Sequence, residues 1–111
     1  MKFPTKMLAT VAIACAVGAP AAYANCHLPP APSKIPDGAS ATMQEMVTAM
    51  QTIKEYNNDV QTYLKCLDFE VRQNQLSPDS QVSLHNAAVD QLKQIADKFN
   101  DQVRAFKSKH S

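Results

Sequence analysis

The stretch TMQEMVTAMQTIKEYNNDVQTYLKCLDFEV (residues 42–71) decides the fold, because it repeats apolar residues at helical spacing and contains no glycine or proline. The spacing alternates between three and four, the heptad pattern of a helix that packs against a second helix. The series is Met43, Met46, Met50, Ile53, Asn57, Val60, Leu64, Leu67 and Val71. Its one polar member, Asn57, is expected to set the helix register. Thr42 and Glu45 form a capping box, with Ser40 as a competing cap, so we predict a helix over about 42–74.

A second helix is predicted over about 78–108. Ser77 suits its cap, Pro78 its first position, and Asp79 the positive end of its dipole. Its heptad series is Val82, His85, Val89, Leu92, Ala96, Phe99, Val103 and Phe106. Because a link of a few residues joins the two helices, they must run antiparallel, with paired residue numbers summing to about 153.

A proline-rich arm, residues 25–39, precedes the helices. Its four prolines exclude a helix and favour an extended, polyproline-like chain. Cys26 and Cys66 are the two cysteines that follow the first 24 residues, and we expect them to form a disulfide. The extended arm from Cys26 to the helix start is ~43 Å long and the helix from there to Cys66 is ~39 Å. The arm should therefore run back along the first helix beside Tyr56 and Tyr63.

The first 24 residues have the pattern of a secretion signal. Lys2 and Lys6 precede a short apolar run, and Ala22-Tyr23-Ala24 supplies a cleavage site. We expect cleavage there and a periplasmic or secreted mature chain starting at Asn25. Lipid attachment at Cys15 is the alternative, although the residues before it fit less well. Nine basic and ten acidic residues remain after cleavage, a balance that does not favour nucleic acid or anionic lipid as a partner.

Together these patterns predict an all-α protein. It is an antiparallel two-helix hairpin, similar to a coiled coil, spanning 40–111, with the extended N-terminal arm attached by a disulfide. The domain plan is a signal peptide at 1–24, the arm at 25–39 and the hairpin at 40–111.

Apolar residues outside the two heptad series are the candidates for contact with a partner protein. Leu84, Ala88 and Ile95 widen the apolar side of the second helix beyond what one neighbouring helix needs. Phe69 falls on the outer side of the first helix, where it is either covered by the start of the mature chain or left as an exposed anchor.

Met43, Met46 and Met50 share one side of the first helix and are weak candidates for binding Cu(I), since thioethers are soft ligands. Core packing explains the same spacing better. His85 is interpreted as a boundary histidine bonded to a carboxylate or a carbonyl, with Asp68 and Glu70 within reach, rather than as a metal ligand or pH sensor. No cofactor is expected.

Short motifs resemble a group of small exported bacterial proteins of unknown activity. They are IPDGASAT (35–42), YLKCLD (63–68), HNAAVD (85–90) and FNDQVRAFK (99–107). In that group a proline-rich, cysteine-bearing arm precedes two helices that carry YL-x-C and HN…FN stretches. The resemblance covers nearly all of the mature chain and implies architecture, but no activity.

The sequence favours a non-enzymatic role in the cell envelope, through binding another protein or through self-association. The mature chain has one glycine and therefore no phosphate-binding loop, and a two-helix hairpin offers little concavity for a substrate. A periplasmic stress chaperone is the alternative, although the chain lacks the LTxxQ repeats of known helical examples. Copper binding through the methionines ranks below both.

Overall fold

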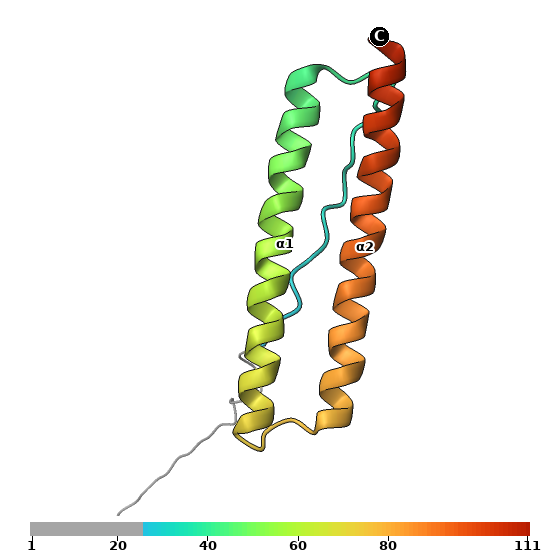
Figure 1. Cartoon of the computed structure of the whole chain (residues 1–111). Helices are drawn as coiled ribbons and strands as arrows, with labels where there is room; N and C mark the ends of the chain where they lie inside the picture. Colours follow the sequence, from blue (N-terminus) through green and yellow to red (C-terminus); the bar gives the residue numbers. More distant parts are fainter. Residues whose placement is uncertain (1–25) are drawn as a thin grey trace, which may run out of the picture.

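Two long antiparallel helices and one extended arm make up the part of the chain that the structure describes (Figure 1). The computed structural model describes residues 26–111, so the expected signal peptide, its cleavage site and Cys15 lie outside the described residues. Helix α1 spans Met43–Arg72 and helix α2 spans Pro78–Lys109. The described part of the chain contains no strand and no helix long and apolar enough to cross a membrane. The predicted all-α hairpin is confirmed.

Local side-chain chemistry sets where each helix begins. The Thr42 hydroxyl accepts a hydrogen bond from the Glu45 backbone N–H at 3.1 Å, and the Glu45 carboxylate accepts one from the Thr42 backbone N–H at 2.9 Å. This is the predicted capping box, and Ser40 does not replace it. At α2 the Ser77 hydroxyl accepts from the Ser80 N–H at 3.1 Å, with Pro78 at the first helical position.

Helix α1 ends two residues earlier than expected because Asn74 adopts a left-handed conformation, with φ of 61°. The Asn74 N–H then donates to the Val71 carbonyl and the Gln75 N–H to the Glu70 carbonyl. These two bonds form a Schellman motif, which satisfies carbonyls that the helix end would leave free. Asparagine tolerates this conformation better than most residues.

The arm lies along the helix pair and completes its core. Cys26, Ala31 and Ile35 pack against a buried cluster contributed by both helices. The cluster comprises Tyr56, Val60, Tyr63, Leu67, Ala88 and Ile95. Figure 1 shows the arm running between α1 and α2 toward the C-terminal end of α2, from where the chain crosses to the start of α1. The predicted path of the arm along α1 is therefore confirmed, and the arm packs against residues of α2 as well.

The arm ends in a tight turn that is pressed against the last turns of α2. The Asp37 side chain accepts from the Ala39 N–H at 2.9 Å, and the Asp37 carbonyl accepts from the Ser40 and Ala41 N–H groups. The Gly38 N–H donates to Oε1 of Gln102 on α2 at 2.8 Å. Asp37 thus shapes a turn that brings Gly38 onto α2.

Because the arm occupies one flank of the helix pair, the core stripe of each helix is rotated away from the predicted heptad series. On α1 the buried residues follow the line of Tyr56, Val60, Tyr63 and Leu67, while Asn57 is exposed. Asn57 therefore does not set the register, and that prediction is wrong. The predicted pairing of residues between the two helices is nevertheless correct to within one helical turn, since Gln81 on α2 donates to the Asp68 carboxylate at 3.0 Å.

We expect Thr42→Ala to cost about 1 kcal/mol of unfolding free energy at neutral pH, which is typical for the loss of a helix cap. The hydrogen bond from the Thr42 backbone lowers the pKa of Glu45 below its ordinary value of 4.5. The carboxylate's part of the cap is thus fully present above that value and is lost as pH falls through the lowered pKa. The backbone N–H of residue 42 can donate to Glu45 in both proteins, so urea titrations between pH 7 and pH 3 should show both losing stability as Glu45 is protonated. The difference between them should persist, because only the wild type has the Thr42 hydroxyl that accepts from the Glu45 N–H.

Candidate functional site

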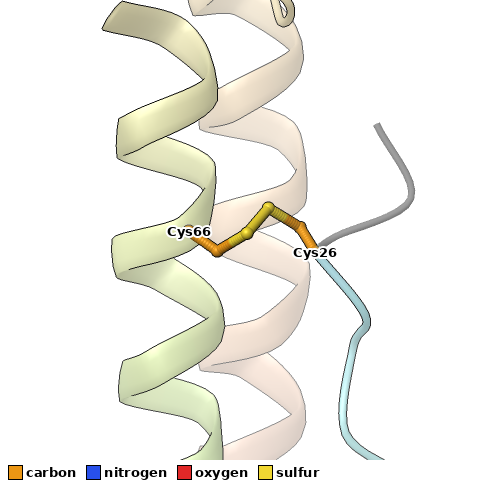
Figure 2. The surroundings of a disulfide bond; sticks show 2 residues. All are labelled: Cys26 and Cys66. Atoms are coloured by element: carbon orange, nitrogen blue, oxygen red, sulfur yellow. A yellow bond between two sulfur atoms is a disulfide. The ribbon is translucent and has the colours of Figure 1, made fainter. Parts of the chain in front are cut away.

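The predicted disulfide joins Cys26 of the arm to Cys66 of α1, with Cα atoms 5.6 Å apart (Figure 2). A shallow hollow of about 260 Å³ lies beside it. It is lined by His27, Pro29, Asp59, Thr62, Tyr63 and the two cysteines. The bond fixes the far end of the arm, so its position in the fold indicates a structural role.

Glu70 is buried one turn beyond Cys66, and its Oε1 has no hydrogen-bond partner. A carboxylate oxygen of Glu70 and the sulfur atoms of Cys26 and Cys66 all lie within 4.8 Å of one another. Since both sulfurs are used in the disulfide, they do not offer a metal ion the thiolates that it would need. Burial raises the pKa of Tyr63, and the Glu70 charge adds to that effect. Burial alone raises the pKa of Tyr56, whose hydroxyl is also unpaired.

Two of the four predicted partner contacts are part of the core. Ala88 and Ile95 are buried in the cluster that the arm helps to cover, so neither is available to a partner. The excess apolar width of α2 is explained by the arm, which is a second neighbour for that helix. Leu84 remains 40% exposed and Phe69 52% exposed. Phe69 is therefore not covered by the described part of the chain, and its role as an anchor for a partner stays a prediction.

Residues that the heptad series assigned to the core are exposed instead on the flank opposite the arm. Met43 is 63% exposed and Met50 40%, while on α2 Val82 is 57% and Val89 37% exposed. Residues seven apart lie almost directly above one another on a helix, so each of these pairs belongs to one row. We call this flank the open face.

The open face consists of two neighbouring rows of residues on each helix. The α1 rows are Met43, Met50, Asn57 and Leu64, and Val47, Lys54, Gln61 and Asp68; the α2 rows are Val82, Val89, Ala96 and Val103, and His85, Leu92, Phe99 and Phe106. Two surface hollows confirm that these rows share a face, because each hollow is lined by members from both helices.

The smaller of these hollows, the methionine hollow, has a volume of about 270 Å³ and lies near the free ends of the hairpin. It is lined by Met43, Met46, Val47, Met50, Phe99, Val103, Phe106 and Lys107. His110 stacks on the Phe106 ring at 4.0 Å between ring centroids, and its Nδ1 lies 2.9 Å from the Phe106 carbonyl oxygen. The hollow is a flexible apolar surface with a single charged group, Lys107, at its edge.

The three methionines named as weak copper candidates therefore do line a common hollow. Met46, however, is buried in the core, and the remaining lining is aromatic and aliphatic. Such surroundings suit an apolar ligand group better than a cation.

The second hollow of the open face, the His85 hollow, lies near the α1–α2 turn. Gln61, Leu64, Lys65, Asp68, Gln81 and His85 line it. The predicted bond from His85 to Asp68 or Glu70 does not form. Asp68 instead accepts from Gln81 and pairs with Arg72 at 3.7 Å, while His85 is exposed.

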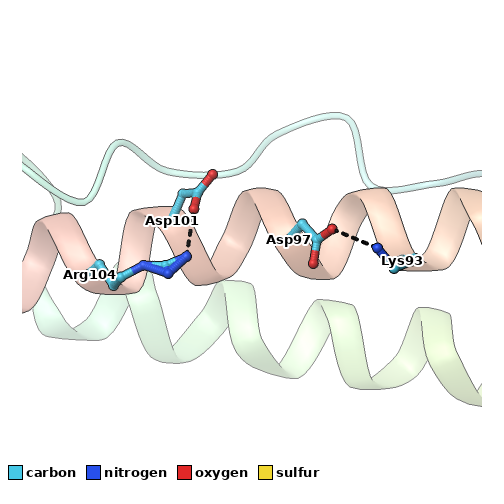
Figure 3. A network of polar contacts seen from close by, with 4 residues as sticks. All are labelled: Lys93, Asp97, Asp101 and Arg104. Carbon is cyan, nitrogen blue, oxygen red and sulfur yellow. Dashed lines mark hydrogen bonds and ion pairs between the residues drawn. The ribbon is translucent and has the colours of Figure 1, made fainter.

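The outer surface of α2 carries ion pairs and little apolar area. Lys93 pairs with Asp97 at 3.5 Å, and Arg104 with Asp101 at 2.8 Å (Figure 3). These pairs are exposed and i,i+3 or i,i+4 in spacing, so they stabilise the helix only slightly. This surface is an ordinary solvated helix face.

No family model matches the sequence, and neither the curated proteins nor the solved structures provide a match. The resemblance to the group of small exported proteins therefore stays a prediction.

Proposed function

We propose that this protein is a non-enzymatic binding module of an oxidising compartment, periplasmic or secreted, which holds an apolar segment of another protein on its open face. The observation that carries the proposal is the exposure of Met43, Met50, Val82 and Val89 in aligned rows. Four of the seven exposed large apolar residues of the described chain lie on this one flank. Exposed large apolar residues that gather on one face of a protein are a mark of interaction sites, whereas single ones scattered over the surface are not.

The character of the surface supports a protein ligand. Methionine side chains are flexible and polarisable, and they adapt to the shape of a partner. Phe99, Val103 and Phe106 form a more rigid floor behind them. The Cys26–Cys66 disulfide supports the proposed compartment, because such bonds persist outside the reducing cytosol.

The same flexibility favours a stress chaperone as the second candidate, since methionine-rich surfaces bind unrelated sequences. The two candidates differ in how many proteins occupy the open face: a dedicated module holds one, and a chaperone holds many unfolding chains.

Photocrosslinking in intact cells tests both candidates. A photoreactive residue at Met50 or Val89 lies on the open face, whereas the neighbouring positions Gln51 and Asp90 are exposed and point away from it. We expect capture from positions 50 and 89 but not from 51 and 90. One captured protein supports the dedicated module, and a ladder of unrelated proteins supports the chaperone.

Binding must then be reproduced with purified components. The captured protein should bind the oxidised wild type and should lose most of its affinity for the variant Met50→Gln/Val89→Gln. Both residues are exposed, so circular dichroism should show an unchanged fold. Equal capture from positions 50 and 51, or equal affinity for the variant, would exclude the open face as the binding site.

A further inference from the structure

The charges around the open face are strongly one-sided. Lys107 borders the methionine hollow and Lys65 borders the His85 hollow. Lys54 lies between them, seven residues after Val47 and seven before Gln61, in a row that both hollows share. None of these three lysines has a carboxylate within ion-pair distance among residues 26–111.

Acidic residues are nearly absent from the same face. Asp68 is the one acidic residue in the four rows of the open face. Its carboxylate already pairs with Arg72 and accepts a hydrogen bond from Gln81. Asp59 lies at the disulfide hollow, and Asp97 and Asp101 are paired on the outer side of α2. The rim of the open face therefore carries uncompensated positive charge, although the mature chain as a whole is close to neutral.

The shape of the open face also constrains its occupant. Its rows extend from Met43 to Asp68, a length of ~37 Å along α1. Both hollows lie between the two helices, so the surface is a groove and not a flat or convex patch. A helix laid into such a groove contacts it at heptad spacing, as a third helix does in a bundle.

We propose that the open face binds an amphipathic helix of another protein, about 25 residues long, whose apolar stripe is flanked by aspartate or glutamate. This inference rests on the proposed function and names the chemistry of the partner. Carboxylates on both sides of the stripe would pair with Lys54, Lys65 and Lys107. A second copy of this chain fits less well, because face-to-face packing would bring two sets of these lysines together. A lipid surface would leave the floor of the groove unfilled.

Two synthetic helical peptides of about 25 residues provide the probes. Both carry the same leucine and isoleucine stripe, and the flanking positions are glutamate in one and lysine in the other. Fluorescence anisotropy with the oxidised, full mature chain is expected to show at least about tenfold tighter binding of the acidic peptide at low salt. The preference should decrease as salt is added, since these charges lie at the solvent-exposed rim.

Charge-reversal variants localise the effect. Lys54→Glu/Lys107→Glu reverses two lysines of the open face, and Lys34→Glu/Lys98→Glu reverses two exposed lysines away from its rows, with the same change in net charge. We expect the first variant to prefer the basic peptide and the second to keep the wild-type preference.

Four results would overturn the inference. Equal binding of both peptides would remove the charge requirement while leaving the proposed function intact, and binding of neither would exclude a helical occupant even if crosslinking captures a partner. Tight binding to phosphatidylserine vesicles that Lys54→Glu/Lys107→Glu abolishes would assign the face to a membrane. A dimer in sedimentation that Met50→Gln/Val89→Gln dissolves would assign it to a second copy.

Discussion

The double variant Cys26→Ser/Cys66→Ser should lose about 4 kcal/mol of unfolding free energy, the value that the chain-entropy model assigns to a bond closing a loop of this length. The cysteines are 40 residues apart, so without the bond the unfolded chain regains much freedom. The loss is large against the ~5 kcal/mol that a domain of this size typically has. Urea unfolding followed by circular dichroism measures it.

The structure shows why the arm depends so strongly on this bond. Among the described residues, no hydrogen bond ties positions 26–36 to either helix, and the first such bond is made by Gly38. Between its two ends the arm is held by the apolar contacts of Ala31 and Ile35. Reductant should weaken the wild type by the same amount and leave the double variant unchanged. A loss below about 1 kcal/mol would mean that the bond does not hold the arm in place.

Gly38→Ala is the second substitution with a large expected effect. A Cβ on residue 38 would overlap the Gln102 carbonyl oxygen and would lie 2.8 Å from its carbonyl carbon and 2.9 Å from the Phe106 nitrogen. All of these are backbone atoms of α2, which no side-chain rotation can move away. The turn would therefore have to leave the helix, with loss of the hydrogen bond to Gln102.

We expect Gly38→Ala to cost about 3 kcal/mol, the upper part of the range for overpacking a tight contact. Ala39→Ser is the matched control at the neighbouring position. The side chain of Ala39 is exposed, so this substitution should change stability by less than about 0.5 kcal/mol. Thermal unfolding of both variants makes the comparison. Similar melting temperatures for Gly38→Ala and wild type would show that the turn does not press against α2.

Features that depend on neighbouring residues in the chain were predictable from the sequence. The capping box at Thr42, the Ser77 cap with Pro78 and the antiparallel pairing follow from short-range signals, and all three are present. The disulfide followed from there being one pair of cysteines beyond the expected signal peptide.

The core stripes were harder to predict because a heptad series assumes a single neighbour for each helix. Here the arm is a second neighbour on one flank, so the buried stripe moves toward Tyr56 and Tyr63 on α1 and toward Ala88 and Ile95 on α2. Val82, Val89 and Met50 are left exposed by the same rotation. The contact of Gly38 with α2 could not be predicted from local signals, since it joins positions 64 residues apart. The burial of Glu70 had no signal in the sequence.

Methionine oxidation tests most directly the claim that the arm covers one flank and leaves the other bare. Met43 and Met50 are exposed on the open face, while Met46, between them in sequence, is buried. Mild peroxide treatment of the oxidised monomer, followed by tandem mass spectrometry, should convert Met43 and Met50 to sulfoxides many times faster than Met46. Equal rates at all three residues, or protection of Met50 in the isolated monomer, would contradict the account.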